Sequence, residues 1–62
     1  MHLKGTDEEE KILGILVNEG QSVDNIVRIV GLPTGEVLGT LTTLELKGMV
    51  KNVGGVYMRM DS

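Results

Sequence analysis

Apolar residues recur three and four positions apart through most of the chain up to residue 46. Three segments carry this spacing, at 7–17, 23–30 and 35–46, and polar residues or glycines separate them. A period near 3.6 residues is typical of amphipathic helices, whose apolar stripe packs against a core. We therefore expect three helices with these stripes: Ile12, Leu13, Ile15, Leu16 and Val17; Val23, Ile26, Val27, Ile29 and Val30; Val37, Leu38, Leu41 and Leu44.

Small polar residues and glycines mark the ends of the three segments. The run Thr6-Asp7-Glu8-Glu9 has the form of a capping box, which predicts a helix start at Thr6. Its acids are interpreted as a solvated helix start, where the helix dipole favours negative charge. Ser22 and Thr34 are the predicted N-caps of the second and third helices. Gly20 and Gly31 suit left-handed C-terminal caps of the first and second helices.

After Gly48, which is expected to stop the third helix, the spacing of apolar residues becomes that of strands. The pair Gly54-Gly55 suits the positive φ angles of a two-residue hairpin turn. In that register we expect Val50 and Tyr57 to face the core. The opposite face is then apolar and wet, and it carries Met49, Lys51, Val53, Val56, Met58 and Met60. In a shifted register the methionines would complete the core instead.

Two helices joined by a short turn that contains glycine match the helix-turn-helix pattern, and the hairpin behind them supplies a wing. The predicted fold is mainly α with a small β-hairpin. It is a winged helix-turn-helix with a three-helix core and a C-terminal antiparallel wing. This domain is expected over residues 6–62, and residues 1–5 are interpreted as a disordered linker or a cloning remnant.

Charge and composition narrow the functions that such a domain can have. Nine acidic and six basic residues give a net charge of −3 and a pI near 4.9, whereas DNA-binding domains often have a pI above about 9. Four of the acids lie together at 7–10, so the remainder is close to neutral. The chain has no cysteine, which excludes disulfides and thiolate metal sites. A single aromatic residue argues against a stacking platform for single-stranded nucleic acid.

No pattern in the chain indicates an enzyme. The single histidine, His2, lies in the predicted linker and has no cysteine or serine partner at a usable position. The pair Gly54-Gly55 is not followed by the helix that a phosphate loop requires. We therefore expect no catalytic residue, no metal ligand and no cofactor. Apolar runs are far shorter than the ~20 residues of a membrane span, and no secretory signal is visible. A cytoplasmic protein without membrane association is expected.

Five consecutive motifs are together more specific than the hydrophobic pattern. In chain order they are Ile12-Leu13-x-Ile15-Leu16, Ser22-Val23-Asp24-x-Ile26, Gly31-Leu32-Pro33-x-x-Glu36-Val37-Leu38, Leu41-x-x-Leu44-Glu45-Leu46-x-Gly48-x-Val50 and Gly54-Gly55-x-Tyr57. With these motifs the chain resembles, over roughly residues 8–60, the small C-terminal winged-helix domain of the DprA/Smf family of bacterial DNA-processing proteins. The resemblance implies a cytoplasmic protein of natural transformation. Members of that family protect incoming single-stranded DNA and help to load the recombinase onto it.

The resemblance also implies an accessory role, because a separate Rossmann-like domain supplies the main DNA-binding and dimer-forming part of that family. Two kinds of partner stay open for the winged domain. Weak, salt-sensitive DNA contact would use hydroxyls and cations, namely Thr34, Thr40, Thr43, Lys47, Lys51 and Arg59. Contact with a protein, or with another domain of the full-length chain, would use exposed apolar residues, namely Leu46, Val53, Val56, Met58 and Met60. The alternative function is the DNA-binding domain of a bacterial transcription regulator.

Overall fold

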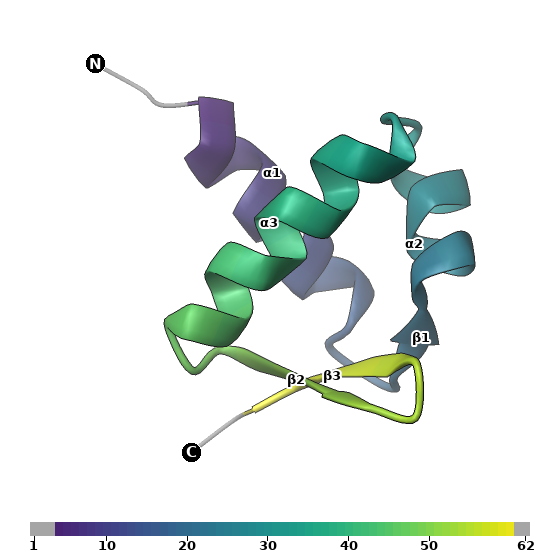
Figure 1. Ribbon diagram of the computed structural model, residues 1–62, viewed down its shortest axis with the longest axis vertical. Coiled ribbons are helices and arrows are strands. Elements are labelled where there is room, and N and C mark those ends of the chain that lie inside the picture. Colours follow the sequence, from purple (N-terminus) through teal and green to yellow (C-terminus); the bar gives the residue numbers. More distant parts are fainter. Residues whose placement is uncertain (1–3, 61–62) are drawn as a thin grey trace.

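The computed structural model describes residues 4–60, with side chains from Asp7 onward, and over this range the chain forms a helical layer and one small sheet (Figure 1). The elements in chain order are α1 (Lys4–Ile15), β1 (Gln21–Ser22), α2 (Val23–Val30), α3 (Thr34–Leu46), β2 (Val50–Val53) and β3 (Val56–Arg59). Figure 1 shows α3 crossing α1 and the sheet lying along one end of the helices. The predicted three helices and C-terminal hairpin are confirmed.

The sheet has three strands, in the order β1-β3-β2, where a two-stranded hairpin was predicted. β3 is the central strand and pairs antiparallel with both neighbours, Gln21 opposite Tyr57 on one side and Asn52 opposite Tyr57 on the other. β1 has only two residues, so no alternation of apolar and polar positions could reveal it in the sequence. This short strand ties the connection between α1 and α2 to the wing.

All three helices and both hairpin strands contribute to one apolar core. Its buried side chains are Ile12, Leu13, Leu16, Ile26, Val37, Leu41, Leu44, Val50 and Tyr57. All of them were expected to face inward, but Val17, Ile29 and Leu38 were expected there too and are 53%, 56% and 39% exposed. Val17 lies beyond the end of α1. Ile29 and Leu38 lie about a quarter turn from the centres of their stripes, so their side chains are directed partly away from the core.

The predicted caps of α2 and the predicted stop of α3 are confirmed. The Ser22 hydroxyl accepts a hydrogen bond from the backbone N–H of Asn25 at 3.2 Å. Gly31 is left-handed, with φ 78°, and its N–H donates to the Val27 carbonyl at 2.8 Å. Gly48, with φ 75°, follows the end of α3, and its N–H donates to the Glu45 carbonyl at 2.9 Å. The bond to Ser22 satisfies an N–H group at the start of α2, and the bonds from Gly31 and Gly48 satisfy carbonyl groups at helix ends, all of which a helix by itself leaves without partners.

Three other predicted helix ends are wrong. α1 begins at Lys4, so Thr6 lies inside the helix and is not its N-cap. α1 ends at Ile15, well before Gly20, and Gly20 does not have a positive φ angle. The N-cap of α3 is Pro33, whose carbonyl accepts the N–H of Glu36 at 3.0 Å and of Val37 at 3.1 Å. The helix therefore already starts at Thr34. Of the predicted linker, residues 1–3 lie outside the described residues.

Gly20 is required for close packing instead of for a helix cap. A Cβ atom at this position would lie 2.7 Å from Cγ1 of Val56, 2.9 Å from Cγ of Met58 and 3.1 Å from the carbonyl oxygen of Tyr57. The backbone before β1 thus passes directly against β3. Only a residue without a side chain permits this approach.

Candidate functional site

One face of the hairpin packs on the core and the other is exposed to solvent, in the register that the sequence predicts. Val50 is 2% exposed and Tyr57 is 7% exposed. The turn residues Gly54 and Gly55 have φ angles of 61° and 89°, as a type I′ turn requires. The Asn52 side-chain oxygen accepts the N–H of Gly55 at 2.9 Å, which closes the turn.

The opposite face of the hairpin is exposed and mostly apolar. It is called the outer wing face here and consists of Met49, Lys51, Val53, Val56, Met58 and Met60. The exposed fractions of its apolar residues range from 37% for Val56 to 55% for Val53. The shifted register, in which the methionines complete the core, is therefore wrong. Four of the five residues predicted for protein contact lie on this face, and Leu46 lies apart from it at the end of α3.

The face of α3 that points away from the core carries almost no charge. Gly35, Gly39, Thr42 and Leu46 follow one another at spacings of four, three and four residues, which places them on one side of the helix. All four are exposed, and Leu46 is 85% exposed. The centre of this face can offer a hydroxyl to a ligand but no cation.

Two of the residues predicted to contact DNA are turned toward α1 and hold its carboxylates. The Thr40 hydroxyl lies 3.0 Å from Oε1 of Glu8 and 3.1 Å from the Glu36 carbonyl oxygen, both of which can accept its hydrogen bond. The Lys47 ammonium donates to both carboxylate oxygens of Glu9, at 2.9 and 3.1 Å. The pairs Glu8–Thr40 and Glu9–Lys47 are together called the α1–α3 clasp. They bring an acidic helix start onto the polar edge of α3.

The other predicted DNA-contacting residues do not gather into one basic surface. Thr34 and Thr43 are exposed on α3, and the Thr43 hydroxyl donates to the Gly39 carbonyl at 3.1 Å. Lys51 lies on the outer wing face. Arg59 lies on the other face of the hairpin, and its guanidinium donates to the Leu13 carbonyl of α1 at 3.4 Å. The cations of this set therefore face in different directions.

Sequence reasoning missed the α1–α3 clasp because its partners are far apart along the chain. The acids at 7–10 were interpreted as a solvated helix start, yet Glu9 is only 17% exposed and Lys47 is 51% exposed. Rules for helix side chains relate residues three or four positions apart, and no such rule relates a residue of α1 to one of α3. The one indication of the clasp in the sequence was that the acids at the start of α1 and Lys47, directly after α3, are opposite in charge.

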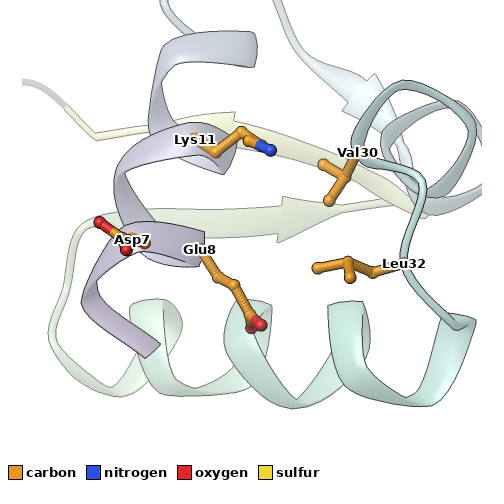
Figure 2. A pocket seen from close by; sticks show the side chains of 5 residues that line it. All are labelled: Asp7, Glu8, Lys11, Val30 and Leu32. Carbon is orange, nitrogen blue, oxygen red and sulfur yellow. The ribbon is translucent and has the colours of Figure 1, made fainter. Parts of the chain in front are cut away.

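A hollow of about 190 Å³ lies beside Glu8, between α1 and the residues Val30 and Leu32. Figure 2 shows its lining: Val30 and Leu32 form an apolar side, Asp7 and Lys11 project from α1, and Glu8 extends toward α3. Typical ligand pockets measure ~300–1,000 Å³. We assign no ligand to this smaller hollow. Within residues 4–60 no group of three or more His, Cys, Asp or Glu is placed to hold a metal ion.

The helix-turn-helix of α2 and α3, followed directly by the wing, defines a winged helix domain. The family model of the DprA winged helix domain matches residues 4–55, and the chain belongs to this family. No curated protein and no solved structure matches the chain. The helices of the described part of the chain are too short or too polar to span a lipid bilayer.

Proposed function

We propose that this chain is the accessory winged-helix module of a DprA-like protein that acts in DNA uptake, natural transformation and recombination. Membership of the DprA winged helix family supports the assignment of the module. The alternative, a transcription regulator, has no comparable support. A cytoplasmic location belongs to the same proposal, and no catalytic step, metal ion or cofactor is assigned.

We further propose that the module works through protein contact at the outer wing face. The observation that carries this proposal is the row of exposed valine and methionine side chains, 37–55% exposed, on a domain with a net charge of −3. Contiguous apolar surface of this kind marks partner sites on soluble domains. Methionine side chains adapt to the shape of a partner. The partner that the family resemblance favours is the Rossmann-like DNA-binding domain of the same full-length protein.

The test is an NMR titration of the labelled module with the separately produced Rossmann-like domain from the same genome. Amide shifts are expected to cluster on β2 and β3. Val53→Lys should weaken binding at least tenfold, because it places a charge in the apolar contact. Ile29→Lys is the matched control, since Ile29 is 56% exposed and Val53 is 55% exposed. Equal weakening by the two variants, or the absence of shifts on the hairpin, would reject the proposal.

Weak DNA contact is the second candidate function. Its support is the helix-turn-helix geometry, with the α3 residues Thr34 and Thr43 exposed and Lys51 exposed on the wing. The test is a residue-resolved NMR titration with single- and double-stranded DNA at low and high salt. Shifts on α3 and the hairpin that disappear at high salt are expected, because phosphate contacts release counterions. The absence of shifts up to millimolar DNA would reject this candidate.

A further inference from the structure

We propose that the acidic start of α1 inhibits phosphate binding by α3 through the α1–α3 clasp. This inference rests on the second candidate function, weak DNA contact. The ligand is the DNA backbone phosphate, and the inhibited groups are the Thr40 hydroxyl and the Lys47 ammonium. The Glu8 and Glu9 carboxylates occupy these groups in the positions that phosphate oxygens would take.

Lys47 is the central cation of this inference. Its ammonium is engaged by both oxygens of Glu9, at 2.9 and 3.1 Å. A carboxylate and a phosphate offer the same kind of negatively charged oxygen acceptors. Lys47 is nevertheless 51% exposed, whereas Glu9 is 17% exposed. The cation therefore faces solvent, where a phosphate can reach it, and the carboxylate approaches it from the protein side.

Thr40 extends the same arrangement along the edge of α3. A hydroxyl has one hydrogen to donate, and the acceptors within reach of Thr40 are the Glu8 carboxylate, at 3.0 Å, and the Glu36 carbonyl, at 3.1 Å. Figure 2 shows the Glu8 side chain extending from α1 toward α3. A phosphate that approaches Thr40 meets a carboxylate already in place, so the hydroxyl cannot bind it without displacing Glu8.

The charges along this edge of α3 explain why the clasp would inhibit phosphate binding. Each of the two groups already faces a carboxylate of α1, Lys47 that of Glu9 and Thr40 that of Glu8, and a carboxylate repels an incoming phosphate. Removal of the Glu9 charge leaves Lys47 without its acidic partner. An ion pair with a half-exposed lysine adds little to stability, so the fold is expected to persist when the pair is broken. α3 itself contains no lysine or arginine, and the clasp engages Lys47, the cation directly after it.

The experiment compares the DNA affinity of Glu9→Gln with that of Glu10→Gln, measured by fluorescence anisotropy on a labelled duplex at several salt concentrations. Glu10 is exposed and neighbours Glu9, so both variants change the net charge by the same amount. Glu9→Gln should bind about fivefold more tightly than the wild type, and the salt dependence should steepen by ~0.9, the slope of one phosphate contact. Glu10→Gln should change affinity less than twofold. Adding Lys47→Met to Glu9→Gln should abolish the gain.

Each other outcome overturns the inference in a distinguishable way. An equal gain from Glu9→Gln and Glu10→Gln would show that only the overall charge matters. Binding by the wild type without any gain from Glu9→Gln would leave DNA contact standing and remove the clasp. No binding by any variant would remove both the clasp and the second candidate function, while protein contact at the outer wing face would be unaffected. Circular dichroism of each variant confirms that it is folded.

Discussion

At the residue scale, two glycines of this chain lie in opposite environments. A Cβ atom at Gly20 would approach Val56, Met58 and the Tyr57 carbonyl oxygen to 2.7–3.1 Å. A Cβ atom at Gly14, within α1, would meet no atom within 4 Å apart from its chain neighbours and the backbone of its own helix. Glycine at the first position thus permits close packing, whereas glycine at the second only adds backbone freedom to the unfolded chain.

We predict that Gly20→Ala lowers the free energy of unfolding by about 1–3 kcal/mol, the range for overpacking. The methyl group must displace a β-branched side chain and crowd a backbone carbonyl of the central strand. Gly14→Ala is the control and should raise the free energy of unfolding by up to about 1 kcal/mol. Urea unfolding followed by circular dichroism measures both. A Gly20→Ala variant as stable as the wild type would contradict the close approach to β3.

At the scale of the elements, the sequence predicts those features that local chemistry determines. Ser22 and Gly31 cap α2 within three or four residues of their partners, and the turn at Gly54-Gly55 sets the hairpin register. The end of α1 at Ile15 could not be read in this way, because no cap residue marks it and the chain beyond it turns toward β3. β1 and the α1–α3 clasp depend on partners distant in the chain, so they were not predicted.

The cap of α2 gives a prediction at this scale. Ser22→Ala should lower the free energy of unfolding by about 1 kcal/mol, because the Asn25 N–H loses its side-chain acceptor. Ser22→Asp should retain most of the stability, since aspartate is an equally good N-cap. Thermal unfolding of the three proteins under identical conditions tests this. If the aspartate variant were as unstable as the alanine variant, the loss would come from the pairing of β1 instead of the cap.

At the scale of the whole molecule, stability depends on the small core that the described residues form together. The free energy of unfolding of a folded domain is about 0.05–0.15 kcal/mol per residue. For this chain of 62 residues that gives roughly 3–9 kcal/mol. A small domain buries a modest fraction of its surface. Figure 1 shows the start of α1 away from the sheet, whereas the end of α3 adjoins β2. Lys47 of the clasp is two residues from Met49 of the outer wing face, so the two proposed contacts are distinguished by their variants, Glu9→Gln and Val53→Lys.

Alanine substitutions at two leucines of α3 compare the loss of core packing with the loss of an exposed side chain. Leu41 is fully buried, whereas Leu46 is 85% exposed. Leu41→Ala should cost about 2–5 kcal/mol, the range for buried leucines, which is a large part of the total. A substantial fraction of this variant should be unfolded at room temperature. Leu46→Ala should change the free energy of unfolding by no more than about 0.5 kcal/mol. Amide NMR spectra of the two variants would show the difference directly, and a well-folded Leu41→Ala would contradict the core described above.

The central position of β3 has a consequence for how the domain forms during synthesis. β1 and β2 both pair with β3, yet the ribosome makes β3 last of the three. At about 5–20 residues per second, β1 waits seconds for its partner strand. During that interval the helices can form, but the inward face of the hairpin cannot close over them. The domain is therefore expected to become resistant to proteolysis only after Tyr57 has left the ribosome.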